Sequence, residues 1–231
     1  MSERLPRVAA SIVVAVATAI VILALAILPF LNPAWVSFEQ GRSRADAWTG
    51  FSPSELRTAT DAILADLLLG PPNFDIEVRG QPVLSAQERG HMADVRGVFV
   101  AFSLLAIISA AVLAVARRLG RGEAAFWRSV RAGAIGATAA IIAIGLVGMY
   151  AFDAVFEAFH RLFFTGGNYT FDPTTDRLVQ LFPYQFWMET SFVLGVVVLI
   201  LAAVAMWLAQ RHLAVSPNQP VARQVPVDVA R

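Results

Sequence analysis

The chain has 231 residues, of which 57% are hydrophobic and 15% are charged, and its formal net charge is +1. Long uncharged apolar runs recur along it, which is typical of an integral membrane protein and not of a soluble domain. The small net charge argues against a nucleic-acid partner, because phosphate binding needs a clustered basic face outside the membrane. The absence of cysteine excludes disulfides, thiolate nucleophiles and iron–sulfur ligands.

The first apolar run, at residues 8–31, carries no charge and is long enough for a helical membrane span of about 20 residues. A cleaved signal peptide is the alternative, but its apolar core is only about 7 to 15 residues long. We therefore predict the first transmembrane helix here, preceded by a cytoplasmic N-terminus at residues 1–7.

Residues 32–93 are too polar to lie in lipid, and they predict a small α/β outer domain between the first two spans. Ser52 and Glu55 fit a capping box, which predicts the start of a helix. Apolar and acidic residues alternate from residue 74 to residue 78, which favours a short strand. The residues at 79–82 are then expected to turn the chain.

A second capping box, formed by Ser85 and Glu88, predicts the start of a helix that continues into the second span at residues 94–116. Glu88, His91 and Asp94 recur every three residues, so they follow one face of this helix. The alternative interpretation is an ordinary helix entrance with solvated charges, because polar residues collect at the ends of spans.

Five arginines crowd residues 117–131, which predicts a short cytoplasmic loop by the positive-inside rule. A run rich in Ala and Gly predicts the third span at 132–152, and another apolar run predicts the fourth at 186–210. The tail at 211–231 is expected to be cytoplasmic and disordered. The predicted fold is an all-α membrane protein with four transmembrane helices and both termini inside.

The outer loop at residues 153–185 departs from this pattern, because it starts with ionisable residues at the end of a span. Asp153, Glu157 and His160 share one helical face. Ionisable residues at the boundary of a membrane are functional candidates by default. Neighbouring antiparallel spans place His160 and His91 on the same outer side at similar depth, so we expect the loop to re-enter and the two rings to meet.

The rest of this loop carries two turn signals, at residues 166–168 and 172–173, around a short apolar piece. They predict a tight hairpin. Residues 176–182 are expected to form one or two helical turns before the last span begins after Pro183.

Two motifs carry a resemblance to a known family: ERGHMADVRGVF, which contains His91, and FHRLFFTGGNYTFDPTTDRLVQLFP, which contains His160. Set on a four-span frame over about residues 5–210, they resemble the family of integral membrane proteins that includes the bacterial lipoprotein intramolecular transacylase. The resemblance implies a reaction at the outer face of the cytoplasmic membrane. An acyl chain would move from the glyceryl oxygen of a diacylglyceryl-cysteine lipoprotein to its own α-amino group, giving a lyso-form lipoprotein. It also implies that His91 and His160 are the essential pair.

The chemistry of this reaction fits two histidines. Attack on an ester needs an amine freed of its proton, and a base with a pKa near neutrality can remove it, so we expect His91 to be the general base. His160 is expected to stabilise the oxyanion or to protonate the leaving oxygen. No protein nucleophile is needed, which agrees with the absence of cysteine and of a Gly-x-Ser-x-Gly motif.

Several further residues are expected to support the pair. Glu88, Asp94 and Glu157 are expected to orient the rings. The remaining supporting candidates are Asp153, Tyr169, Asp172 and Asp176. Tyr169 stands where the resemblance favours a tryptophan, and Tyr184 stands where it favours an acidic residue.

Two alternatives stay open on the sequence alone. The first is a metal-dependent hydrolase that uses the histidines and neighbouring carboxylates, although no His-Glu-x-x-His motif is present. A non-enzymatic assembly or sensor protein with structural polar clusters is the second. We expect no metal or cofactor. The expected partners are lipoprotein substrates and membrane lipid. The oligomeric state is open.

Overall fold

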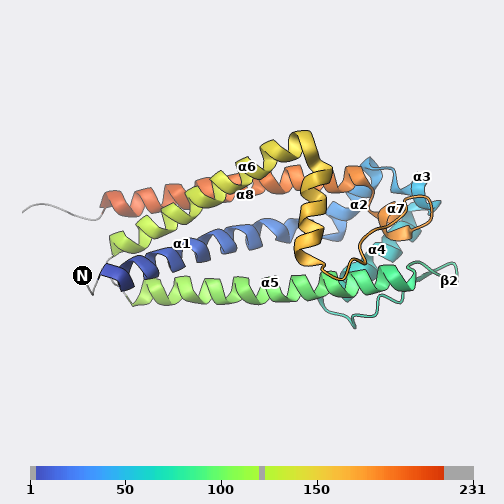
Figure 1. Ribbon diagram of the computed structural model, residues 1–231, viewed down its shortest axis with the longest axis horizontal. Coiled ribbons are helices and arrows are strands. Elements are labelled where there is room, and N and C mark those ends of the chain that lie inside the picture. The colour runs from blue at the N-terminus through green and yellow to red at the C-terminus, as the bar shows by residue number, and fades with distance from the viewer. Residues whose placement is uncertain (1–3, 120–122, 216–231) are drawn as a thin grey trace, which may run out of the picture.

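The computed structural model describes residues 4–119 and 123–215, and almost all of its regular structure is helical (Figure 1). Four segments are long and apolar enough to cross a membrane, as the sequence predicted. They are α1 (Arg4–Ile27) with its short extension η1 (Leu28–Leu31), α5 (Ala86–Arg118), α6 (Glu123–Phe163) and α8 (Tyr184–Val215). Parts of the expected N-terminus, Arg-rich loop and tail lie outside the described residues, at 1–3, 120–122 and 216–231.

The spanning helices pack through small side chains. Ala26, Ala134 and Ala202 are buried where α1, α6 and α8 meet. At Gly133 of α6, an added Cβ would overlap the backbone carbonyl of Ala15 in α1. Small residues at such contacts let helix backbones approach closely in a membrane, where the hydrophobic effect does not drive helices together.

The remaining elements lie beyond one end of the spans (Figure 1). Between α1 and α5 these are α2 (Pro33–Arg42), α3 (Ala45–Thr49), α4 (Pro53–Leu68) and the two strands β1 (Glu77–Val78) and β2 (Gln81–Pro82). Between α6 and α8 lies α7 (Arg177–Leu181). One core, which contains the buried side chains of Ile63, Phe74 and Leu181, joins α3, α4, β1 and α7 to the first turns of α5.

Helix α4 begins at the capping box that the sequence predicted. The Glu55 carboxylate accepts from the backbone N–H of Ser52 at 2.8 Å, and the Ser52 hydroxyl accepts from the N–H of Glu55 at 3.4 Å. Arg79 donates to both Glu55 carboxylate oxygens at 2.6 and 2.7 Å. The hydrogen bonds from Arg79 and then those from Ser52 lower the pKa of Glu55 to about 2.

The strand expected from residue 74 to residue 78 is shorter than predicted, with only Glu77 and Val78 in β1. Phe74 has a φ of 49°, in the left-handed region that a strand cannot use, and its N–H donates to the Asp66 carboxylate at 3.0 Å. The predicted turn is present but narrower, because Arg79 and Gly80 both have positive φ and Gln81 already belongs to β2.

The expected Arg-rich loop at 117–131 is also shorter than predicted. Helix α5 continues to Arg118 and α6 already begins at Glu123, so Arg128 and Arg131 lie on the first turns of α6. Arginine is a good helix former, and the charge pattern could not show where the helix resumes.

The hairpin expected between residues 161 and 183 is wrong, because no strands pair among the described residues of this segment. Instead the Asp172 carboxylate accepts from the backbone N–H of Thr174 at 2.8 Å, which closes the chain locally. The backbone N–H of Asp176 donates to the carbonyl of Asp172 at 2.8 Å. The predicted helical turns are present as α7.

Candidate functional site

A break in α6 positions the second histidine. Ala151 has φ −146° and ψ 51°, which is not helical, and the chain resumes its helix beyond it. The segment at residues 152–163 therefore turns away from the axis of α6 and crosses the bundle towards α5 (Figure 1). No sequence signal predicted this break, since no proline lies in α6.

The break brings the two predicted histidines together. The ring centroids of His91, on the first turns of α5, and His160 lie 6.0 Å apart, with an angle of 21° between the ring planes. His91 is only 5% exposed. The two rings thus face one another at the junction between α5 and the last turns of α6.

Aromatic side chains surround both rings. Phe164 contacts both, with centroids 4.8 Å from His91 and 5.5 Å from His160. Phe171 lies 5.5 Å from His91, and Phe156 lies 4.2 Å from His160. Such a surround excludes water on one side of the pair, which strengthens electrostatic interactions there.

The proton position on His160 follows from its hydrogen bond. Its Nδ1 lies 2.8 Å from the backbone carbonyl oxygen of Phe156. A carbonyl oxygen only accepts, so Nδ1 carries the hydrogen. In the neutral ring, Nε2 then holds a lone pair and can accept a proton.

Asn168 joins the site, although the sequence had suggested only a turn at this residue. Its Nδ2 donates to the Asp94 carboxylate at 2.8 Å. The imidazole of His91 interacts with the Asn168 side chain, yet neither His91 Nδ1 nor Asn168 Oδ1 has a partner in strict hydrogen-bond geometry. Two buried polar atoms without partners are costly, which is typical of a site that is used. The position of Asn168 in the TGGNYT motif was the one available signal.

Glu88 contacts backbone and not imidazole. It is 1% exposed, and its carboxylate accepts from the N–H groups of Ser85 and Leu178, each at 2.6 Å. The first bond caps α5, as predicted, and the second fixes the start of α7 to α5. Among the described residues Glu88 forms no hydrogen bond with either histidine, so it orients the loop above the pair.

The other acidic candidates differ in their placement. Glu157 accepts from Arg161 at 2.8 Å and from the hydroxyl of Tyr169 at 3.3 Å, and the ring of Tyr169 lies 5.2 Å from His160. Asp153 is exposed and, within the described ranges, has no hydrogen bond or ion pair.

Asp172 and Asp176 form hydrogen bonds within the loop and, among the described residues, none with either histidine. The Asp176 carboxylate accepts from the N–H of Asp172 at 2.7 Å. Hydrogen bonds from the hydroxyl and the backbone of Thr174 lower the pKa of Asp172.

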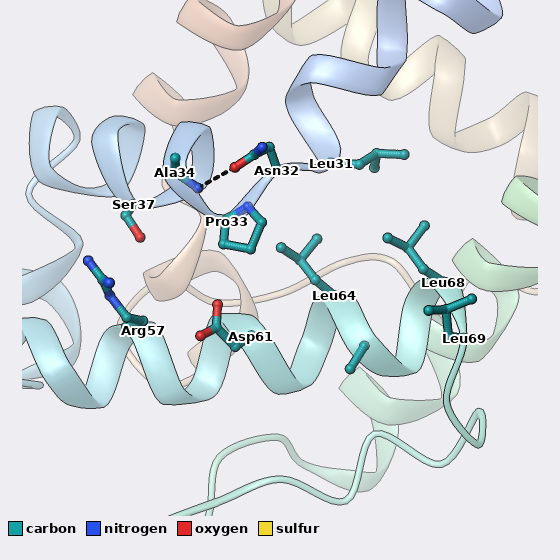
Figure 2. A pocket seen from close by; sticks show the side chains of 11 residues that line it. Leu31, Asn32, Pro33, Ala34, Ser37, Arg57, Asp61, Leu64, Leu68 and Leu69 are labelled. Atoms are coloured by element: carbon teal, nitrogen blue, oxygen red, sulfur yellow. Dashed lines mark hydrogen bonds between the residues drawn. The ribbon is translucent and has the colours of Figure 1, made fainter.

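The same structure bears on where a ligand would bind. No group of three or more His, Asp or Glu side chains placed to hold a metal occurs among the described residues. A hollow of about 550 Å³ between α2 and α4 is lined by residues such as Leu31, Arg57 and Leu69 (Figure 2). Neither histidine lines it, so it is separate from the candidate site.

Solved structures of one membrane-integral protein share this fold. The chain is similar to the in meso structure of the membrane integral lipoprotein intramolecular transacylase Lit from Bacillus cereus, with 19% identity, 90% of this chain and 96% of that chain covered, and a TM-score of 0.75. Two structures of the Bacillus cereus protein with a histidine replaced by arginine or alanine match with TM-scores of 0.74 and 0.69. Their identities are 18% and 19%, with 92% of this chain and 94% and 96% of those chains covered. No curated protein sequence matches the chain.

The structural similarity, at these identities, establishes the fold. The sequence provides the assignment, because the model of the lipoprotein intramolecular transacylase family Lit matches residues 12–187. This match covers more than half of the chain and includes His91, His160 and Asn168. The chain therefore belongs to the Lit family of lipoprotein intramolecular transacylases, which are membrane acyltransferases.

Proposed function

We propose that this transacylase moves an acyl chain from the glyceryl oxygen of a lipoprotein's diacylglyceryl cysteine to the α-amino group of the same cysteine. The product is a lyso-form lipoprotein. The observation that carries the proposal is the pair of facing imidazoles, 6.0 Å apart, between α5 and the broken end of α6. Since amine and ester belong to one molecule, holding them together supplies much of the entropic advantage.

The hydrogen bond of His160 supports it as the general base. Its Nδ1–H is held by the carbonyl of Phe156, so its Nε2 lone pair can take a proton from the attacking amine. The resulting imidazolium then returns this proton to the glyceryl oxygen as the ester C–O bond breaks. This reverses the roles expected from the sequence, where His91 was the base.

His91 then supplies the hydrogen-bond donor. The attack turns the ester carbonyl oxygen into an oxyanion, which a donor beside the developing charge stabilises. His91 faces His160 across the site, and an N–H of its ring serves as this donor. The water-poor surround of Phe164 and Phe171 increases the effect.

Mass spectrometry of a lipoprotein's N-terminal peptide tests the reaction. A diacylglyceryl lipoprotein is incubated with the purified enzyme in detergent, and the position of each acyl chain is read from fragment ions. We expect one chain to move onto the α-nitrogen with no change in total mass. A mass loss of one acyl chain would indicate hydrolysis, as the metal-dependent alternative requires, and an unchanged peptide would contradict both.

The orientation in the membrane is a separate part of the proposal. The arginines near the α5–α6 connection support a cytoplasmic location for that end, which places the histidines at the outer face. Reporter fusions at residues 60 and 170 should then report an outer location and a fusion at 122 a cytoplasmic one. A cytoplasmic signal at residue 60 would contradict this orientation.

A further inference from the structure

The hollow between α2 and α4 has an apolar part and a charged part (Figure 2). The charged part contains Arg57 and Asp61, which both extend from α4 towards α2. The volume of about 550 Å³ is within the range of sites that bind small molecules. The apolar part is formed by four leucines and a proline: Leu31, Pro33, Leu64, Leu68 and Leu69.

The apolar part lies at the level where the spans begin. Leu31 is the last residue of the first apolar span. Arg96, directly before the uncharged part of α5, donates to the carbonyl oxygens of Asp66 and Gly70 and so holds the end of α4 at the same level. Leu69, at this end of α4, is 91% exposed. Exposed apolar side chains beside the end of a span are typical of contact with lipid.

The charged part lies farther from the spans. The first turn of α4 is bound through Glu55 to Arg79, in the turn between β1 and β2. Figure 1 places β2 at the far end of the molecule from the N-terminus. The lining therefore changes from apolar at Leu69 to charged at Arg57 with distance from the spans. A phospholipid has the same order of groups, from acyl chain to headgroup.

The two charges of the hollow are available to a ligand. Arg57 and Asp61 are exposed, and neither forms a hydrogen bond or an ion pair with another described residue. They lie on one helix face with Cβ atoms about 5–6 Å apart, but a cation that precedes an anion by four residues is the less favourable order for pairing. A cation and an anion that face one hollow unpaired are complementary to a ligand that carries both charges.

We propose that this hollow binds phosphatidylethanolamine. The lipid phosphate accepts from the guanidinium of Arg57, and the ammonium group, joined to the phosphate by a short ethylene link, donates to the carboxylate of Asp61. One acyl chain follows Leu64 and Leu68 to the bilayer beside Leu69. The bound lipid has no part in acyl transfer, because neither histidine lines the hollow. It connects the region beyond the spans to the bilayer.

Native mass spectrometry of the full-length protein tests this. The protein is incorporated in nanodiscs with equal amounts of phosphatidylethanolamine, phosphatidylcholine and phosphatidylglycerol, then released and scored for retained lipid. Phosphatidylcholine has a quaternary ammonium without an N–H, and phosphatidylglycerol has no cation. We expect retained phosphatidylethanolamine to exceed each of them several-fold. Asp61→Asn should remove this preference, and Arg57→Gln should lower retention of all three lipids.

Two variants are matched controls. Glu77→Gln removes the same charge as Asp61→Asn at an exposed position outside the hollow, so it should leave the preference unchanged. Ala65→Trp fills the hollow without changing charge and should lower retention, whereas Thr58→Trp, exposed on α4 outside the hollow, should not.

Three outcomes would overturn the proposal. Equal losses of preference in Asp61→Asn and Glu77→Gln would indicate general surface attraction. Equal retention of the three lipids by the wild type would show that the headgroup is not recognised. Displacement of the retained lipid by an added diacylglyceryl lipopeptide would assign the hollow to the substrate.

Discussion

The spanning helices and the part of the molecule beyond them are held together by different interactions. In the spans, α1, α6 and α8 meet through alanines and through the backbone contact at Gly133. In the part beyond the spans, charged side chains bind backbone groups directly: Glu88 holds the start of α7, and Arg96 of α5 donates to the carbonyl oxygens of Asp66 and Gly70 at the end of α4.

This difference follows from the surroundings of each region. Lipid offers no polar partners, so spanning helices satisfy their own backbone and pack by shape. The elements beyond the spans are short, and their free helix ends need side-chain partners. The histidine pair sits where the two regions meet, so its geometry depends on both.

The largest effect is expected at the pair itself. His160→Gln removes the base and should lower transacylation about 10²–10⁴-fold. His91→Gln keeps an amide N–H donor, so it should retain more activity than His91→Ala, which loses an oxyanion donor worth about 10²–10³. Initial rates from the mass-spectrometric assay, with melting temperatures as a folding control, give the comparison. If His160→Gln were more active than His91→Gln, the roles of base and oxyanion donor would have to be exchanged between the two histidines.

Substitution of Glu88 tests most directly what holds the region beyond the spans together. Glu88→Ala removes the cap at Ser85 and leaves the buried N–H of Leu178 without a partner, which by itself costs about 1–3 kcal/mol. We expect a lower melting temperature and faster proteolysis of the α6–α8 connection. Glu77→Ala, at an exposed carboxylate, is the control and should leave both unchanged. Equal behaviour of the two variants would show that Glu88 does not hold α7.

Substitution of Gly133 tests the packing of the spanning helices. Gly133→Ala forces Cβ onto the carbonyl of Ala15 and should destabilise the protein by about 1–3 kcal/mol. Gly136→Ala is the control: nothing lies within 4 Å of its added Cβ, and alanine favours a helix by about 1 kcal/mol. The melting temperature in detergent should therefore fall for Gly133→Ala and rise for Gly136→Ala. A neutral Gly133→Ala would mean that the helices separate without cost.

Substitution of Asn168 tests how the loop after α6 is connected to the histidine pair. Asn168→Ala removes the hydrogen bond to Asp94 and the polar group beside His91, so we expect about a tenfold loss of activity. The pH profile of the rate should shift while the melting temperature stays within a degree or two of wild type. Loss of stability without a shift of the profile would assign Asn168 a purely structural role.

The smallest effect concerns Glu39 of α2, which is 1% exposed. Burial, and then its interaction with Glu189, raises its pKa to about 7 although Arg42 opposes the shift. Between the ordinary pKa of 4.5 and about 7 the folded state binds more protons than the unfolded state, so stability falls as pH rises through this window. Glu39→Gln should remove this part of the pH dependence of melting. If the melting temperature of Glu39→Gln differs between pH 5 and pH 8 as much as that of the wild type, this prediction is wrong.

The sequence by itself determined the elements that depend on local chemistry. Uncharged runs long enough for a bilayer identified the four spans, and the capping boxes at Ser52 and Ser85 located the starts of α4 and α5. The motifs around His91 and His160 indicated the family that the comparison then showed. In each case the signal lies within a few turns of chain.

Only the tertiary structure decided how these parts meet. The break at Ala151 turns His160 towards α5, and the left-handed Phe74 shortens β1, although neither residue type requires that conformation. Asn168 and Leu178 become partners of Asp94 and Glu88 across more than 70 residues. Such long-range hydrogen bonds leave no periodicity in the chain, because they depend on how separate helices pack and not on the spacing of residues within one.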